Sequence, residues 1–282
     1  MAVYAAGDGD MMHLKSRREI DRLRASADLV GRVLAEVARH VEPGVSTREL
    51  DRIAEDYIRR SDAEPAFKGY QVGSSSPYPG TLCVSVNDVI VHGIPGGYRL
   101  KAGDLIAIDC GVKLGGYYGD SAYTFAVGDI SAEQTRLCQV TYEALYKGIA
   151  QAIHGQQVGD ISHAVQSHCE AHGFGVVRDL VGHGIGRELH EDPQVPNVGR
   201  PRTGRRLRTG ATLCIEPMIN MGTFEVTVSK DGWTVRTADG APSAHYEHMV
   251  AVGPEEPEIL TTFQYIEDVT HPPYLQEAPT YG

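Results

Sequence analysis

Two acidic residues follow apolar runs of the kind that form buried strands. Asp109 follows the run LIAI at 105–108, and Glu216 follows LCI at 213–215. An ionised carboxylate in such surroundings needs a counter-charge, because burial without one is costly or forces the acid to take up a proton. Neither run has a Lys or Arg at a matching position to form a salt bridge. Both acids are therefore candidate metal ligands.

Each of these acids is followed by a second one. Asp120 lies eleven residues after Asp109, with a Gly-Gly pair between them, which is typical of two strands joined by a tight turn. Such a hairpin brings both carboxylates onto one face of a sheet. In the other half of the chain Glu216 is followed by Glu247, in the segment HYEH.

Histidines add metal-ligand and proton-transfer chemistry near neutral pH. His183 and His190 frame the segment GHGIGRELH, in which the glycines let the backbone approach a ligand closely. His92 opens the same His-Gly-Ile triplet earlier in the chain. His245 and His248 flank the last of the four acids, and both are expected to point to the opposite face of that strand.

The candidate ligands carry more negative charge than one divalent cation neutralises. Four carboxylates and one imidazole therefore predict two divalent metal ions bridged by shared carboxylates. Two-metal sites activate a water molecule and stabilise the tetrahedral oxyanion of amide hydrolysis, so a hydrolase is the predicted class. Oxygen-rich ligands suit Mn, Fe, Co or Zn without distinguishing among them.

Helices and short strands are predicted to position these residues. Capping boxes predict helices after Ser16, Ser46 and Ser131. In a capping box, the Ser side chain and that of an acid or amide three residues later each accept a hydrogen bond from the other residue's backbone N–H. Helical apolar spacing predicts another helix over 161–169. Strand-type runs cover 82–91, 104–112, 116–127, 174–181, 211–220, 224–236 and 244–252. Alternating groups of helices and strands indicate an α+β fold.

The order of elements repeats within the chain. Apolar residues stand 6, 9, 10 and 14 positions after Gly44 and again after Gly155. An acid stands six positions after Gly103 and again after Gly210. The repeat predicts two halves related by a pseudo-twofold axis, with matched acids facing each other.

Composition limits the class of protein. The chain has 282 residues, of which 41% are hydrophobic and 22% charged, as in ordinary globular proteins. Its formal net charge of −11 argues against broad nucleic-acid binding. The five Cys are scattered singly, without a pattern typical of disulfide frameworks or zinc ribbons. With no membrane-length apolar run, a cytoplasmic, non-membrane protein is expected.

Six segments together resemble the type I methionine aminopeptidases of the pita-bread metallohydrolase superfamily. They are VHGIP at 91–95, IDCGVKLGGYYGD at 108–120, GHGIGRELHEDPQV at 182–195, CIEPM at 214–218, KDGWTV at 230–235 and SAHYEH at 243–248. The resemblance implies one catalytic domain over 15–266, preceded by an N-terminal extension at 1–14 and followed by a C-terminal tail at 267–282. The implied fold has duplicated halves and a curved antiparallel sheet covered by two helix pairs.

The resemblance also implies a role for each candidate residue. The five metal ligands would be Asp109, Asp120, His183, Glu216 and Glu247. Asp120 and Glu247 would bridge the two ions. A metal-bridging water would attack the first peptide carbonyl, Glu216 would shuttle its proton, and His92 with His190 would hold the scissile amide.

The implied pocket for a methionine side chain is apolar and largely aromatic, as thioethers favour. It is lined by Phe67, Tyr70, Tyr78, Cys83, Leu189 and Trp233. Two features depart from the usual pattern of the family. Segment 71–77 lengthens the connection between the pocket tyrosines, and Leu189 stands where a bulky aromatic residue is usual. Both are expected to change the pocket rather than the catalytic centre.

The implied function is removal of the initiator methionine from nascent proteins when the second residue is small. The expected partners are nascent polypeptide N-termini, and the protein is expected to be a monomer. The Arg-rich segment Arg200–Arg208 lies between His190 and Glu216, so it is expected near the active-site mouth. There it would contact ribosomal RNA through phosphates.

Two alternatives remain at this point. A proline-specific aminopeptidase or prolidase-like hydrolase would share the ligands, but such chains are expected to carry an additional N-terminal domain, for which there is no room before Lys15. A non-catalytic ribosome-associated binding protein on the same fold would be expected to have lost ligands, and all five are present.

Overall fold

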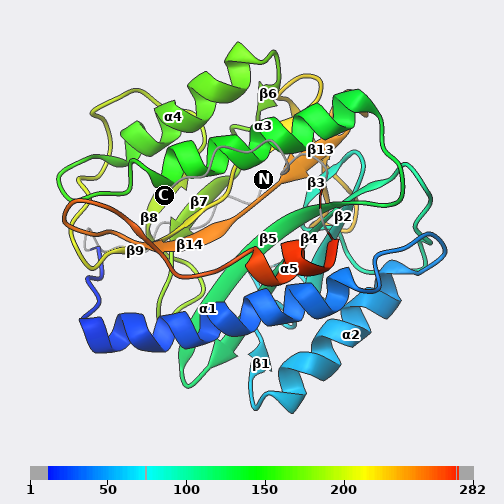
Figure 1. The fold of residues 1–282 in the computed structure, drawn as a ribbon, viewed down its shortest axis with the longest axis horizontal. Coiled ribbons are helices and arrows are strands. Elements are labelled where there is room, and N and C mark those ends of the chain that lie inside the picture. Colours follow the sequence, from blue (N-terminus) through cyan, green and yellow to red (C-terminus); the bar gives the residue numbers. More distant parts are fainter. Residues whose placement is uncertain (1–11, 74, 271, 273–282) are drawn as a thin grey trace.

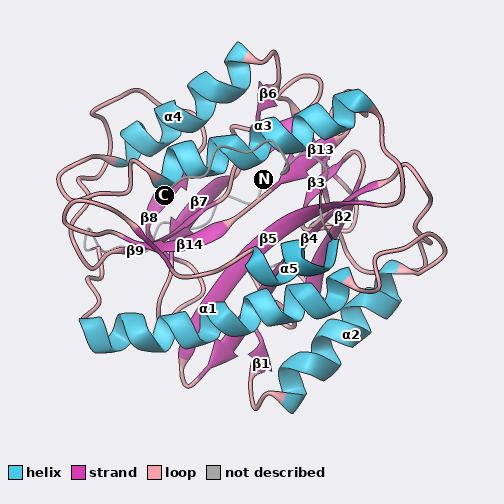
Figure 2. Cartoon of the chain, viewed as in Figure 1, coloured by secondary structure: helices cyan, strands magenta, loops and turns pink. Residues whose placement is uncertain are grey.

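The structure is a computed structural model that describes residues 12–73, 75–270 and 272. Its helices are α1 (Arg17–Ala38), α2 (Thr47–Arg60), α3 (Ala132–Ile149), α4 (Val158–Ala171) and α5 (Gln264–Thr270). Its strands are β1 (Glu64–Pro65), β2 (Leu82–Val86), β3 (Val89–Val91), β4 (Leu105–Leu114), β5 (Tyr117–Ala126), β6 (Gly175–Val176), β7 (Val181–Gly184), β8 (Glu191–Pro196), β9 (Thr212–Ile215), β10 (Met218–Asn220), β11 (Val226–Val228), β12 (Val235–Thr237), β13 (Ser243–His245), β14 (His248–Ala251) and β15 (Glu258–Ile259). Figures 1 and 2 show α1, α3 and α5 lying over the strands.

Helices α1, α2 and α3 begin where the capping boxes predict. The side chains of Ser16, Ser46 and Ser131 each accept a hydrogen bond from the backbone N–H three residues later, and the reciprocal bonds are present. These interactions satisfy donors that the first helical turn leaves unpaired. Helix α5 was not predicted, and it runs through the domain boundary expected at residue 266. Among the described residues, no helix has the length and apolar character needed to cross a bilayer.

The strands form antiparallel sheets in each half of the chain. In the first half β4 pairs with β1, β2 and β5. In the second half β9 lies between β7 and β14, with β8 and β15 at the edges. An isolated bridge between Ala122 and Glu247 joins the two halves. The predicted strand over 224–236 is instead two strands, β11 and β12, which pair as a hairpin.

The duplicated pattern corresponds to matched backbone conformations. Gly44 before α2 and Gly155 before α4 have φ angles of 96° and 92°. Gly103 before β4 and Gly210 before β9 have φ angles of 94° and 90°. These are left-handed conformations that glycine adopts without steric cost. The repeat seen in the sequence is therefore confirmed as a structural repeat.

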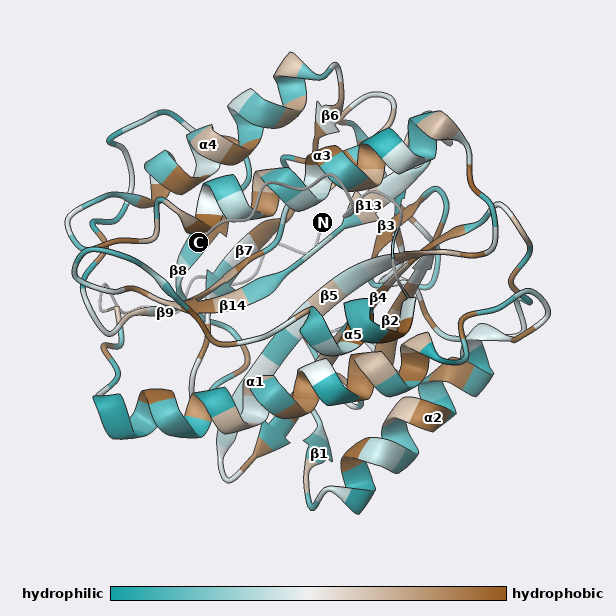
Figure 3. Cartoon of the chain, viewed as in Figure 1, coloured by the Kyte–Doolittle hydropathy of each residue, from teal (hydrophilic) through white to brown (hydrophobic). Residues whose placement is uncertain are grey.

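The main hydrophobic core lies between the helices and the sheets. Helix α1 packs on β4 and β5, and α3 packs on β9, β10 and β13. Leu34 of α1 and Ile108 of β4 belong to this core, as do Leu145 of α3 and Ile215 of β9. Figure 3 shows hydrophobic and hydrophilic residues alternating around these helices. The sheets that contain β4 and β9 thus have one face packed against helices, and the other face is available for a site.

Candidate metal centre

Strand alternation separates the acids from the helix-covered core. In β4, Ile108 and Cys110 belong to that core, so Asp109 between them points to the opposite face. In β9, Ile215 belongs to the same core, so the next residue, Glu216, also lies on the opposite side. The apolar runs that contain these acids thus place their neighbours, and not the acids, in the helix-covered core.

The β4–β5 hairpin brings Asp109 and Asp120 together, as the Gly-Gly turn predicts. Gly111 is paired with Asp120, and Asp109 with Ala122, so the two acids are neighbours on one face. Their carboxyl groups are close enough for each to affect the pKa of the other. The two glycines of the turn have φ angles of 57° and 83°, as a type I′ hairpin requires.

The second half of the chain contributes three candidate ligands from neighbouring strands. His183 in β7 is paired with Cys214 in β9. Glu216 directly follows β9, and Glu247 directly precedes β14, which pairs with β9. The Glu247 backbone N–H donates to the Ala122 carbonyl at 2.9 Å. This contact places the candidate ligands of the second half against the hairpin of the first.

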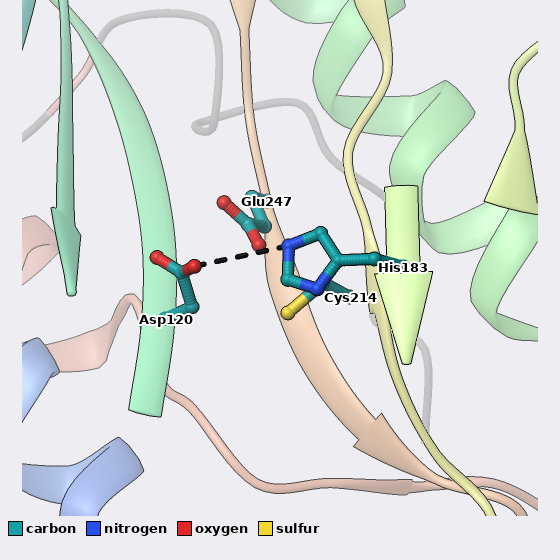
Figure 4. Close-up of side chains that lie close together, drawn as sticks. All are labelled: Asp120, His183, Cys214 and Glu247. Atoms are coloured by element: carbon teal, nitrogen blue, oxygen red, sulfur yellow. Dashed lines mark ion pairs between the residues drawn. The ribbon is translucent and has the colours of Figure 1, made fainter. Parts of the chain in front are cut away.

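His183 lies at the centre of the acids. Its Nε2 is 3.7 Å from Glu216 Oε1 and 3.9 Å from Asp120 Oδ2. Its Nδ1 lies 2.9 Å from the Gly184 carbonyl, to which it donates. Figure 4 shows the His183 ring turned toward the carboxylates of Asp120 and Glu247. The backbone hydrogen bond leaves Nε2 free to act as a metal ligand.

Two further side chains belong to the cluster and were not predicted. The sulfur of Cys214 lies within 4.8 Å of ligand atoms from three of the predicted residues. His245 was expected to point away from Glu247, and this was wrong, because its Nε2 lies 3.6 Å from Glu216 Oε2. Residues two apart in a strand share a face, which was the available signal. His248, one residue further, points into the opposite core, where it stacks on an aromatic ring.

The electrostatics of the cluster fit bound cations. One buried oxygen in each of Asp109, Asp120 and Glu247 has no hydrogen-bond partner among the described residues. Burial raises the pKa of Asp109 to about 6, and burial together with neighbouring carboxylates raises the pKa of Asp120 well above its usual value. Burial lowers the pKa of His183 to about 4, so the ring is neutral at physiological pH. Clustered acids with unsatisfied oxygens and a neutral imidazole form a donor set suited to divalent metal ions.

The structure brings all thirteen predicted site residues to one pocket of about 500 Å³ that opens to solvent. They are Phe67, Tyr70, Tyr78, Cys83, His92, Asp109, Asp120, His183, Leu189, His190, Glu216, Trp233 and Glu247. The six predicted methionine-pocket residues also pack in one hydrophobic cluster. Acidic and apolar linings thus meet in one cavity.

His92 is held in a strained conformation at the end of β3. Its φ angle is 58°, which is uncommon for a residue other than glycine. The next residue, Gly93, has no room for a side chain, because a Cβ there would lie 2.1 Å from the Val84 carbonyl oxygen. Burial lowers the pKa of His92 to about 4, so its ring is neutral. Strain of this kind clusters at functional sites.

His190 connects the acidic cluster to the apolar pocket. Its ring centroid is 4.3 Å from that of His183. Its Nδ1 is 2.6 Å from the Tyr70 hydroxyl. Burial lowers the pKa of His190 well below its usual value, with further lowering from His183 and His92. The longer connection after Tyr70 thus leaves its hydroxyl in contact with His190.

Comparison with known proteins identifies the class of this chain. Residues 21–254 match metallopeptidase family M24, and the chain belongs to that family. It is 51% identical to the methionine aminopeptidase of Clostridium perfringens, over 89% of this chain and 99% of that protein. The crystal structure of methionine aminopeptidase from Rickettsia prowazekii matches with a TM-score of 0.87 and 40% identity, over 89% of this chain and all of that one.

The wider fold is shared with enzymes of other specificity. Prolidase from Pyrococcus furiosus matches with a TM-score of 0.72 at 21% identity, and the alignment covers 66% of that chain. At this identity the likeness shows the fold alone. The fold is thus the predicted α+β pita-bread fold, and the relatives at high identity do not favour the proline-specific alternative.

Proposed function

We propose that this protein is a methionine aminopeptidase that removes the initiator methionine from nascent proteins whose second residue is small. The observation that carries the proposal is one pocket in which a buried cluster of four acids and a neutral histidine adjoins an apolar, aromatic lining. The similarity to curated methionine aminopeptidases over nearly their full length supports it. Since nascent chains emerge in the cytoplasm, the proposal places the protein there.

The proposed metal site holds two divalent ions, chosen among Mn, Fe, Co and Zn. The ligands would be Asp109, Asp120, His183, Glu216 and Glu247, with Asp120 and Glu247 shared between the ions. When bound, such ions lower the pKa of water and stabilise negative charge on a carbonyl oxygen. The unsatisfied oxygens of Asp109, Asp120 and Glu247 support this assignment.

Glu216 is the proposed proton carrier. Its carboxylate lies between His183 and His245, and burial raises its pKa well above the usual value. A carboxylate with a raised pKa accepts a proton near neutral pH. We infer that a Glu216 carboxylate oxygen takes the proton of the attacking water and passes it to the leaving amine.

His92 and His190 are proposed to hold the scissile amide. Both rings are neutral, so each has one nitrogen that donates and one that accepts. With the Tyr70 hydroxyl donating to Nδ1 of His190, the ring proton resides on Nε2. That N–H is proposed to donate to the carbonyl oxygen of the first peptide bond, where negative charge develops during hydrolysis.

The apolar part of the pocket is proposed to bind the methionine side chain. Phe67, Tyr78, Cys83 and Leu189 are buried there, and Tyr70 and Trp233 are partly buried against them. A flexible thioether packs favourably against such aromatic surfaces. One chain supplies the whole lining, so we propose that the protein acts as a monomer.

Peptide cleavage tests the proposed function. The purified protein loaded with divalent metal should release Met from Met-Ala-Ser and Met-Gly-Met-Met, and spare peptides whose second residue is Leu or Lys. Cleavage of Xaa-Pro peptides without Met release would favour a prolidase-like hydrolase. Binding of Met peptides without hydrolysis, at full metal loading, would favour the non-catalytic alternative.

A ribosome contact through the Arg-rich segment is a second proposal. Four of its arginines, Arg200, Arg202, Arg206 and Arg208, are exposed. The segment was expected near the mouth of the pocket, but it packs on the start of α4, where the Arg202 N–H donates to Asp160 Oδ1 at 2.8 Å. None of its residues lines the pocket. The position of Arg200–Arg208 between His190 and Glu216 in the sequence therefore did not determine where this segment lies in the fold.

Co-sedimentation with ribosomes tests this contact. Phosphate contacts by arginine weaken steeply with salt. Wild-type protein should therefore sediment with ribosomes at low salt and be released at high salt. A variant with all five arginines of the segment changed to Ser should not sediment, while Met-Ala-Ser cleavage remains. Equal, salt-insensitive binding of both proteins would contradict the proposal.

A further inference from the structure

Trp233 is the only tryptophan in the chain, and it forms part of the pocket lining. Its backbone N–H donates to Asp231 Oδ1 at 2.8 Å. Two residues later β12 begins, and it pairs with β3 beside His92. The indole contacts Tyr78 edge-on, with 5.3 Å between ring centroids, and its centroid is 6.3 Å from that of His92. The backbone therefore brings this ring to the boundary between the apolar and catalytic parts of the pocket.

Segment 71–77 stands beside the indole as a loop with a closed base. The Tyr78 N–H donates to the Tyr70 carbonyl at 2.8 Å, which ties its two ends together. Inside the loop, the Val72 N–H donates to the Ser75 hydroxyl at 3.1 Å. These bonds hold the described parts of the segment, 71–73 and 75–77, between the two pocket tyrosines.

The loop binds the one polar atom of the indole. Trp233 Nε1–H donates to the main-chain carbonyl of Ser76 at 2.9 Å. Strand pairing and Asp231 fix the Trp233 backbone but leave the orientation of the ring open. The bond to Ser76 is the polar contact that favours one orientation of the ring, because the indole N–H is the one donor of this side chain.

We propose that segment 71–77 is a specificity-determining element, in which the Ser76 carbonyl fixes the Trp233 indole as a wall of the apolar subsite and restricts that subsite to the unbranched side chain of methionine. The inference rests on the proposed aminopeptidase function. The reason is steric, because a fixed aromatic wall leaves room for a narrow, flexible thioether but excludes a branched side chain. Without the bond to Ser76 the ring can rotate, and the subsite widens.

Two variants break the contact in different ways. Trp233→Phe keeps an aromatic ring but removes the donor, and deletion of 72–76 removes the acceptor. In both, the ratio of kcat/KM for Met-Ala-Ser to that for Leu-Ala-Ser should fall roughly tenfold, as expected for loss of one hydrogen bond. Most of the change should come from a higher KM for the Met peptide. Metal content should stay at the wild-type level.

Intrinsic fluorescence provides a measurement that does not depend on activity. Because Trp233 is the only tryptophan, its emission reports on this contact alone. Deletion of 72–76 should shift the emission to longer wavelength and increase quenching by acrylamide. Lys68→Ala is the control, because that exposed side chain pairs with Glu55 and lies outside the pocket. The control should retain both the fluorescence and the Met-to-Leu ratio.

An unchanged Met-to-Leu ratio in both variants would overturn the proposal, as would unchanged emission and quenching in the deletion variant. If Trp233→Phe changes the ratio and the deletion does not, the ring matters but the segment does not, and the proposal is wrong. Absence of Met release by the wild-type enzyme would instead overturn the proposed function. In that case the fluorescence measurement still decides whether the segment holds the indole.

Discussion

At the scale of single residues, Glu216 and His92 line the same pocket but are proposed to do different things. Glu216→Ala should lose both a metal ligand and the proton carrier, so metal content and turnover should fall together. His92→Ala should keep its metal and lose rate by a factor on the order of 10² or more. Metal analysis of both variants beside kcat measurements distinguishes them. Full turnover of His92→Ala would show that this histidine has been misassigned.

Tyr70 tests the proposed orientation of His190. Tyr70→Phe removes the hydroxyl 2.6 Å from His190 Nδ1 but retains the ring in the pocket. Without that donor, the ring proton is shared between the two nitrogens, so kcat should fall by roughly tenfold while metal content is unchanged. Tyr98→Phe, an exposed tyrosine bonded to Asp104, is the control. A Tyr70→Phe enzyme with wild-type kcat would contradict the assigned tautomer.

At the scale of elements, the turn between β7 and β8 holds His190 in place and is itself held by a buried ion pair. Lys15 Nζ contacts Glu191, and both side chains are buried. Glu191 Oε1 also accepts the Arg187 and Glu188 backbone N–H groups. The segment before α1 is thereby tied to the turn that carries His190.

Removing one charged partner of this ion pair should destabilise the protein more than replacing both partners. Lys15→Met leaves the Glu191 carboxylate buried without its counter-charge, which should lower the free energy of unfolding by roughly 3 kcal/mol. The double variant Lys15→Met with Glu191→Gln should recover much of that loss, because the Gln carbonyl still accepts the turn's N–H groups. Urea unfolding of the three proteins measures this. Equal loss in the single and double variants would contradict the argument.

At the scale of the whole molecule, the acidic cluster couples stability to metal and pH. In the metal-free protein the raised pKa values of Asp120, Glu216 and Glu247 mean that the folded state binds protons the unfolded state has released. Stability contributed in this way is lost as pH rises. The lowered pKa of His183 acts in the opposite sense. Between about pH 4 and pH 6.5 the unfolded state binds a proton that the folded state does not, so this group makes stability rise with pH. Above pH 6.5 the effect of His183 ends, and the raised pKa values of Asp120, Glu216 and Glu247 lower stability as pH rises.

Metal removal should therefore matter more at higher pH. Chelation should lower Tm, and the difference between metal-loaded and metal-free protein should widen from pH 6.5 to 8, because bound cations favour the ionised acids. Thermal unfolding at several pH values measures the effect. Glu247→Gln should flatten the pH dependence of the metal-free protein. A constant difference across this range would contradict the electrostatic account.

The sequence alone determined the features that depend on local chemistry. Ser16, Ser46 and Ser131 act on the next helical turn, and the Gly-Gly pair of the β4–β5 turn acts on its own backbone, so each can be recognised without the fold. The Gly-Gly turn between Asp109 and Asp120 predicted a hairpin with both acids on one face, because a tight turn depends only on the local chain. The resemblance to the type I methionine aminopeptidases implied the full set of pocket residues in advance.

Tertiary structure decided the contacts between segments far apart in the chain. The bond from Trp233 to Ser76, the place of Cys214 among the candidate ligands and the packing of segment 200–208 on α4 all depend on how separate elements dock. These contacts arise from packing and hydrogen bonding between distant segments. In such contacts, each polar or apolar side chain could be satisfied by any of several partners. No local pattern selects among those partners, so only the folded chain does.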